Sequence, residues 1–258
     1  MRLIVLTMTT LLLSLKQNAA DLPIQALQDA TSQQVLSERI ARVYAWRSLE
    51  GEQTDAHRQQ KAATTQFSKQ LDNLRKLSGD DAELKDNYAL LAQLWADYQK
   101  LTDAPSSRHG ATKLAELSEE VSWFARKGRV LVAQRLGIKP QAGSMAADIA
   151  MLSQRLAKTY LLQVYGLKQP FLPRDLAETR HEFNTLSRQL KALPDNDVSV
   201  KAQLALMEQE WFFFQHAIDE LAKNNTDPQL RRNVITTSDR IYQVAIDLAG
   251  RYERRGKV

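Results

Sequence analysis

Apolar residues recur at alternating steps of four and three in two stretches of the chain, which is the spacing of one face of a helix. The first stretch runs through Leu84, Tyr88, Leu91, Trp95 and Tyr98, and the second through Val200, Leu204, Met207, Trp211, Phe214, Ile218 and Leu221. Because a helix with one apolar face must bury it against other helices, the pattern predicts a helix bundle. We interpret the aromatic residues in it as core packing, not as a cofactor site.

Loop signals divide the chain into eight predicted helices. Gly and Pro number only 9 and 7 in 258 residues, which argues against a β-rich fold with its frequent turns. Where Gly, Pro, Asn and Asp do cluster they mark turns, and Asp197 is a predicted N-cap. The predicted helices cover residues 26–50, 54–77, 82–102, 111–136, 143–166, 173–192, 198–223 and 228–253.

The two apolar stretches belong to an internal repeat. The segment Leu36–Tyr44 (LSERIARVY) matches Leu152–Tyr160 (LSQRLAKTY), 116 residues further on. Aromatic landmarks keep this offset, pairing Phe67 with Phe183 and Trp95 with Trp211. In the last helix of each copy the best match shifts to 120 residues, pairing Ser118-Glu119 with Ser238-Asp239.

The repeat predicts an all-α fold of two tandem antiparallel four-helix bundles, because short loops between long helices favour antiparallel neighbours. The first unit is expected at residues 26–137 and the second at residues 143–254. Gly137 and Pro140 mark the boundary, since the first ends a helix and the second blocks its continuation.

The N-terminus has the pattern of a secretory signal peptide over residues 1–20. A basic start at Arg2 precedes an apolar run, Leu3–Leu15, and then Ala19 and Ala20. The run is shorter than the ~20 residues that span a bilayer. We therefore predict export to the periplasm, with an uncleaved N-terminal membrane anchor as the alternative; the exact cleavage site stays open.

Charge and residue content exclude several kinds of function. The net charge of +5 becomes +3 when Arg2 and Lys16 are lost with the signal peptide, and acidic and basic residues are interspersed along the helices. This is a solvated-surface pattern, and we expect no nucleic-acid partner. The chain has no cysteine, and none of His57, His109, His181 and His216 has another histidine at helical ligand spacing. We expect no metal, no cofactor, no catalytic residues and no enzyme activity.

The segment Met151–Lys158 (MLSQRLAK), followed by Tyr160 and Leu161, resembles the first helix of the PilJ/NarX-like sensor domain. This is the helical N-terminal domain of type IV pili methyl-accepting chemotaxis transducers and of nitrate/nitrite sensor kinases, where the helix carries the run A-G-R-Q-R-M-L-S-Q-R-x-A-K. The resemblance implies two tandem sensor domains that bind a small anion or relay a signal to a membrane receptor.

The chain departs from the family at the residue that holds the anion. In the nitrate sensors an arginine at the position of Ala150 ligates nitrate from two subunits that meet at a dimer interface; this chain has Ala150, and Gln34 in the first copy. Another arginine of the run is kept in both copies, beside a serine. The predicted ligand-binding residues are accordingly Ser37, Arg39, Ser153 and Arg155. Alternatively, these arginines are structural partners of buried carboxylates or helix ends.

Two functions follow from these patterns. The first is a non-enzymatic periplasmic sensor-like protein that binds a small anion or relays a signal to a membrane partner. The alternative is an envelope scaffold or interaction protein without a small-molecule ligand, with Trp46 and Trp123-Phe124 as contact points. The oligomeric state is open between a pseudo-dimer within one chain and a homodimer.

Overall fold

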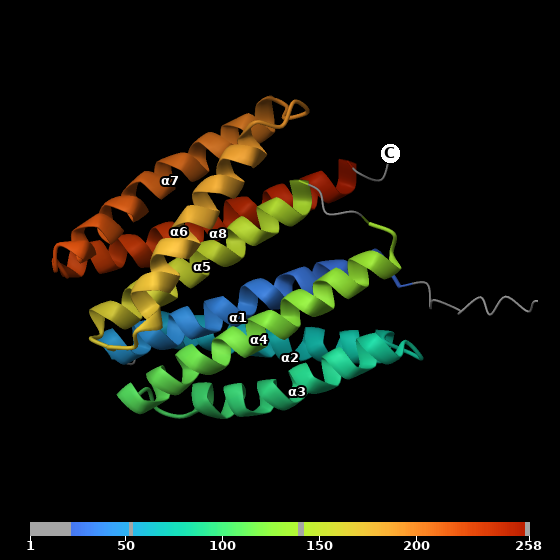
Figure 1. The fold of residues 1–258 in the computed structure, drawn as a ribbon, viewed down its shortest axis with the longest axis horizontal. Helices are drawn as coiled ribbons and strands as arrows, with labels where there is room; N and C mark the ends of the chain where they lie inside the picture. The colour runs from blue at the N-terminus through green and yellow to red at the C-terminus, as the bar shows by residue number, and fades with distance from the viewer. Residues whose placement is uncertain (1–21, 52–53, 139–141, 256–258) are drawn as a thin grey trace, which may run out of the picture.

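The computed structural model describes residues 22–51, 54–138 and 142–255, and every regular element within them is an α-helix (Figure 1). The all-α prediction is confirmed. The signal peptide predicted for residues 1–20 lies outside the described residues. Of the helices that the described ranges contain, none has both the length and the apolarity to cross a membrane.

The helices begin and end within three residues of their predicted limits. They are α1 (Ile24–Glu50), α2 (Thr54–Leu77), α3 (Ala82–Asp103), α4 (Arg108–Arg135), α5 (Ala142–Val164), α6 (Phe171–Lys191), α7 (Val198–Ala222) and α8 (Pro228–Arg255). The largest difference is the start of α4, which the sequence pattern places at residue 111. The helix begins earlier because Ser107 caps it, its Oγ accepting a hydrogen bond from the Gly110 amide at 3.0 Å.

Side-chain caps and a glycine stop fix several of these helix ends. Asp197 caps α7 as predicted, accepting from the Val200 amide at 2.8 Å, and Asp81 caps α3 in the same way. Gly137 follows α4 with a φ of 66°, the left-handed conformation that a glycine adopts most easily after a helix. Local sequence therefore determines where the chain turns.

The helices pack as a first half, α1–α4, and a second half, α5–α8. In the first half α1 and α3 each pack against both α2 and α4; in the second, α5 packs against α6 and α8, and α7 against α8. The halves meet along a seam where α1 lies beside α5, and both helices run in the same direction (Figure 1). We call this α1–α5 contact the seam.

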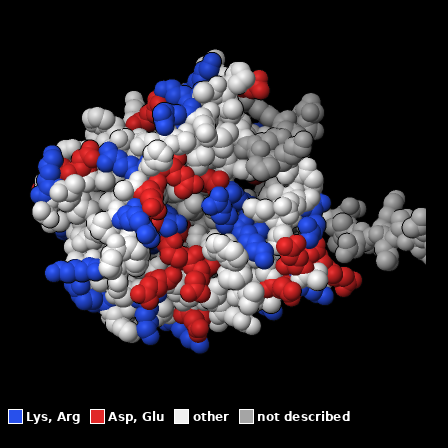
Figure 2. All heavy atoms as spheres, viewed as in Figure 1, with Lys and Arg blue, Asp and Glu red and all other residues white. Residues whose placement is uncertain are grey.

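The aromatic landmarks pack inside each half. Phe67 stacks on Trp95 and Phe183 on Trp211, each pair with ring centroids 4.1 Å apart. All four rings are buried, which confirms their interpretation as core. The visible face carries intermixed Lys, Arg, Asp and Glu, with acidic side chains forming a band through its middle (Figure 2).

Candidate functional site at the seam

The two predicted serines lie inside the structure and bond to their own helices. Ser37 on α1 and Ser153 on α5 are fully buried. The Ser37 hydroxyl donates to the Gln34 carbonyl and the Ser153 hydroxyl to the Ala150 carbonyl, both at 2.8 Å. Since a hydroxyl has one proton to donate, these serines donate it within their own helices and have no donor left for a ligand.

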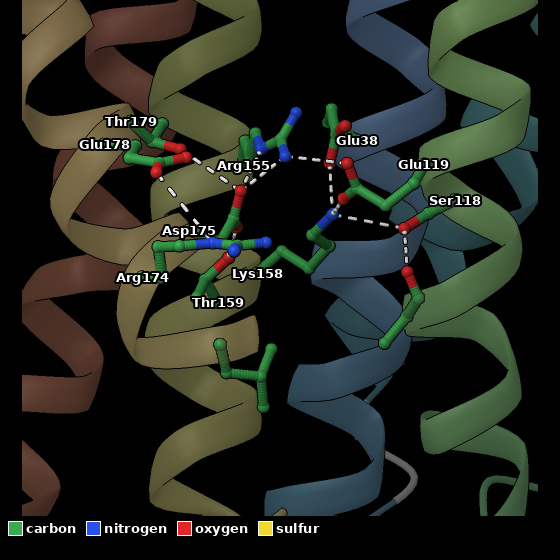
Figure 3. A network of polar contacts seen from close by, with 12 residues as sticks. Glu38, Ser118, Glu119, Arg155, Lys158, Thr159, Arg174, Asp175, Glu178 and Thr179 are labelled. Atoms are coloured by element: carbon green, nitrogen blue, oxygen red, sulfur yellow. Dashed lines mark hydrogen bonds and ion pairs between the residues drawn. The ribbon is translucent and has the colours of Figure 1, made fainter. Parts of the chain in front are cut away.

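Arg155, the predicted site residue on α5, is bound to two carboxylates. Its Nε donates to Asp175 Oδ1 at 2.7 Å, and its Nη2 pairs both with Asp175 and with Glu119 Oε2, the latter at 2.6 Å (Figure 3). Asp175 also accepts from the Thr159 hydroxyl at 2.7 Å. Arg155 thus connects α5 to α6 of its own half and to α4 of the other.

Lys158, one turn further along α5, forms a buried ion pair across the seam. Its Nζ lies 2.8 Å from Glu38 Oε2 on α1, 2.8 Å from Glu119 Oε1 and 3.1 Å from the Ser118 hydroxyl on α4 (Figure 3). The side chains of Lys158 and Glu38 are 2% and 0% exposed. Their charges are shielded from water, so each depends on the other.

Arg39 and Arg42 on α1 make the corresponding contacts on the other side of the seam. Their guanidinium groups lie 2.8 Å and 3.0 Å from Asp239 Oδ1 on α8, and Arg42 also donates to Gln59 Oε1 on α2 at 2.8 Å. We call these residues the set around Arg42, and those that contact Arg155 and Lys158 the set around Lys158. The repeat offsets of 116 and 120 residues match the members of the two sets: Arg39 with Arg155, Arg42 with Lys158, Gln59 with Asp175, and Asp239 with Glu119. Each half therefore sends two cations to one carboxylate of the other half.

The two sets carry opposite formal charges. The set around Lys158 has two cations and three carboxylates, since Glu38 and Asp175 join Glu119. Around Arg42 two cations face the single carboxylate of Asp239. The difference arises at two positions, where Gln154 replaces Glu38 and Gln59 replaces Asp175. Positive charge is in excess on the α1 side and negative charge on the α5 side.

Burial and neighbouring charges shift the pKa values in the set around Lys158. Burial raises the pKa of Glu38, more than the attraction of Lys158 lowers it. Burial lowers the pKa of Lys158, but Glu38 and Glu119 outweigh that effect and the pKa is raised. Burial raises the pKa of Asp175, but the attraction of Arg155 and Lys158 outweighs burial, so the pKa is lowered. Lys158 and Asp175 therefore hold their charges firmly, whereas the raised pKa of Glu38 brings its carboxylate nearer to taking up a proton.

Burial also dominates the electrostatics of Arg42. It lowers the pKa of this guanidinium to about 10, with Asp239 opposing the change and Arg39 adding to it. Arg42 is still protonated at neutral pH, although it is fully buried. Its Nε and Nη1 have no hydrogen-bond partner within the described residues. A buried charge with two unused donors is costly unless an acceptor joins it.

The positions that correspond to the family's nitrate arginine are not electropositive. Ala150 is fully buried, and Gln34 is 1% exposed with its Nε2 lying 3.5 Å from Asp148 Oδ1 across the seam. Asp148 in turn pairs with Arg129 of α4 at 2.8 Å. Because the Asp148 carboxylate lies beside Gln34 and already pairs with Arg129, an anion would meet repulsion at this level of the seam.

A comparison of the chain with known protein families, curated proteins and solved structures finds no match. The resemblance of α5 to the PilJ/NarX-like sensing helix stays a prediction. Within the described ranges, no group of three or more His, Asp or Glu side chains is placed to hold a metal ion.

Sequence reasoning found Arg39 and Arg155 but missed most of their partners. Glu38 and Lys158 lie in the two repeat motifs, yet charged residues on long helices are usually solvated. The available signal was in α5, which carries apolar or small residues around most of its circumference and so leaves its charged residues little access to water. The sequence of α1 gives no such signal, because its buried positions include polar residues such as Gln33 and Gln34. The repeat matches Asp239 to Glu119 but Asp175 to Gln59, and only the folded contacts bring these carboxylates to the seam.

Proposed function

We propose that the chain is a non-enzymatic, sensor-like periplasmic module of two tandem four-helix units, residues 26–137 and 143–254, which binds a small anion at the seam or relays a signal to a membrane partner. The helix contacts support this organisation, because α1 packs on α2 and α4 as α5 packs on α6 and α8. The parallel seam between α1 and α5 corresponds to the subunit contact of the sensor family that the sequence resembles, so the chain acts as a pseudo-dimer.

The excess of positive charge around Arg42 carries the anion proposal. Arg39 and Arg42 face one carboxylate, that of Asp239, which is 24% exposed and so partly stabilised by water. A small oxyanion or carboxylate beside Arg42 would accept from its two unused donors and offset the repulsion between the guanidinium groups. The corresponding place beside Arg155 is taken by Asp175 and Glu119, so we assign the anion to the α1 side.

A signal can pass from this place because the charged sets link six helices. Arg42 shares Asp239 with Arg39 and so connects α1 to α8, while Lys158 connects α5 to α1 and α4. An anion that draws Arg42 away from Asp239 would weaken one cross-half contact and leave the other in place. The resulting shift of one half along the other is the kind of motion that helix interfaces transmit to a membrane partner.

A thermal-shift panel tests the anion proposal. Nitrate, nitrite, other oxyanions and small carboxylates are added separately to the chain without residues 1–20, and a bound anion raises Tm. An anion at 100 times its Kd stabilises the fold by about 2.7 kcal/mol. Arg42→Gln should abolish the shift and Arg155→Gln should keep it. The absence of any shift across the panel would contradict ligand binding, and a shift that survives Arg42→Gln would contradict the assigned site.

The exposed aromatic residues favour the second candidate, an envelope scaffold. Trp123 on α4 is 58% exposed, and Phe212 and Phe213 on α7 are 70% and 53% exposed. Such apolar groups are typical of interaction surfaces. Trp46 and Phe124 are only partly exposed and pack against the core, so they are weaker contact points than Trp123. Capture from envelope extracts tests the proposal, and a capture that Trp123→Ser and Phe212→Ser leave unchanged would argue against these surfaces.

A further inference from the structure

The second half contains a groove between α5, α6 and α7 with a volume of about 510 Å³. Leu176, Ile218 and Leu221 line it with apolar surface, and Arg180, Asn184 and Asp219 add polar groups. It lies at the beginning of α6 and the end of α7, far from the turn that joins the two helices, where they have diverged (Figure 1). Its size is in the range of small-molecule sites in proteins.

The first half fills the corresponding space with its own side chain. Arg47, which the repeat pairs with Gln163 of the groove, is only 4% exposed, and its Nη1 donates to the Thr102 carbonyl at 3.1 Å. Thr102 is the counterpart of Ile218. In the first half α2 also packs against α3. Gln163 is shorter than arginine and bonds instead to the Leu172 carbonyl at 3.4 Å, so the second half leaves this space open.

An ion pair crosses the groove from α6 to α7. Arg180 Nη1 lies 2.7 Å from Asp219 Oδ1, with the two side chains 30% and 52% exposed. Such a pair is weak because water screens it, and each partner can exchange the other for a ligand group. Asn184 accepts a hydrogen bond from the Trp211 indole at 2.8 Å through its oxygen, which leaves its two amide N–H donors for an incoming carboxylate.

We propose that this groove binds a free α-amino acid with a large apolar side chain, such as leucine or phenylalanine. The α-carboxylate pairs with Arg180 and accepts from the Asn184 amide, and the α-ammonium pairs with Asp219. The side chain lies on Leu176, Ile218 and Leu221 and is removed from water.

The charges at the groove select a ligand that carries both signs. A simple anion would pair with Arg180 but leave the neighbouring Asp219 without a partner. A simple amine would pair with Asp219 but leave Arg180 without one. A zwitterion replaces the broken ion pair with two new ones. This site and its ligand class are separate from the anion at the seam, and either proposal can fail without the other.

Calorimetric titration of the chain without residues 1–20 tests the proposal. L-Leucine and L-phenylalanine should bind, whereas 4-methylpentanoate, which lacks the ammonium group, and 3-methylbutylamine, which lacks the carboxylate, should bind roughly tenfold more weakly or worse, since each loses one charged partner. Gln163→Arg copies the arginine of the first half into the groove and should abolish binding. Arg47→Gln is the matched control and should leave it unchanged.

Three outcomes would overturn the proposal: no heat with either amino acid, equal affinity for leucine and its one-charge analogues, or unchanged affinity in Gln163→Arg. A second variant guards against misfolding of the first. Arg180→Gln changes a side chain at the rim and should weaken leucine binding about tenfold with an unchanged circular dichroism spectrum. Retained affinity in Arg180→Gln would exclude the assigned carboxylate contact. A nitrate shift that depends on Arg42 would uphold the seam site whatever leucine does.

Discussion

The two halves share their framework but differ in their polar interior. Both keep the stacked Phe and Trp, and an aspartate caps both α3 and α7. They differ where Arg47 fills the first half and Gln163 leaves a groove in the second. At the seam they differ again, with cations in excess beside α1 and carboxylates beside α5. The comparison teaches that packing landmarks preserve a repeated fold while buried polar positions are free to take different roles.

The largest expected effect comes from removing the buried cation of the second half. Lys158→Met leaves the buried Glu38 carboxyl without its cation, so it must stay unpaired or take up a proton, and the free energy of unfolding should fall by about 3–5 kcal/mol. Adding Glu38→Gln, the residue type at the matched position Gln154, should recover most of the loss. Urea unfolding measures both variants. Arg42→Met is the matched variant in the first half and should cost less, because Asp239 keeps Arg39 and contact with water. An equal cost would remove the proposed asymmetry.

Asp175→Asn tests the carboxylate that the first half replaces with Gln59. The charged hydrogen bonds of Asp175 to Arg155 and Thr159 should be worth about 1.5–3 kcal/mol at pH 7. Since the folded pKa of Asp175 is lowered, this stability is present above the unfolded pKa of about 3.9 and is lost as pH falls through the folded value. The gap between wild type and variant should therefore narrow below about pH 4.

Urea unfolding of wild type and Asp175→Asn, measured from pH 7 to pH 3, gives this difference in stability at each pH. Asp55→Asn is the control, because Asp55 pairs with Arg58 on the surface of α2 and both side chains are mostly exposed. It should change stability little at any pH. If the stability difference between wild type and Asp175→Asn stayed constant on acidification, the Asp175 carboxylate would not be held by its ion pair.

Arg47→Gln makes the first half resemble the second and sharpens the comparison of their interiors. The Thr102 carbonyl loses its buried donor, which should cost about 1–3 kcal/mol. The reverse change, Gln163→Arg, adds a cation to an open groove and should cost less. Thermal unfolding of the two variants provides the measurement. If Gln163→Arg proved the more destabilising, the groove would not be equivalent to the space that Arg47 fills.

The smallest effect on stability is expected on the outer face of α7. Phe212→Glu should change the free energy of unfolding by less than about 0.5 kcal/mol, because the ring is 70% exposed. It should reduce any self-association or partner capture measured by light scattering and pull-down. Ala96→Glu places the same charge at the matched, exposed position of α3 and should leave association unchanged. Similar losses in both variants would indicate a general charge effect.

Sequence predicted the helices well because each depends on local signals. Apolar spacing determined the buried stripe of α3 and α7, and Asp197 and Gly137 marked helix ends that the structure confirms. The largest difference is the start of α4 at Arg108, where a serine in a Gly-containing loop caps the helix.

The partners of the candidate site could be predicted only in part. Repeated arginines indicated Arg39 and Arg155, but their carboxylates lie on helices far away in sequence. Asp239 is 197 residues from Arg42 in the chain, and helical periodicity predicts contacts only between residues close in sequence. The groove depends on the divergence of α6 and α7, which follows from packing and has no local signal.

The parallel seam joins two halves that one chain carries. Separate subunits must meet by diffusion, so the fraction paired falls as their concentration falls. Here the segment between Arg135 and Ala142 tethers the halves at an effective concentration on the order of millimolar. The α1–α5 contact is thus expected to persist however few copies a cell makes. In a homodimer every substitution appears on both sides of the interface. In this chain a substitution can change one side only, so the two faces of the α1–α5 contact can differ.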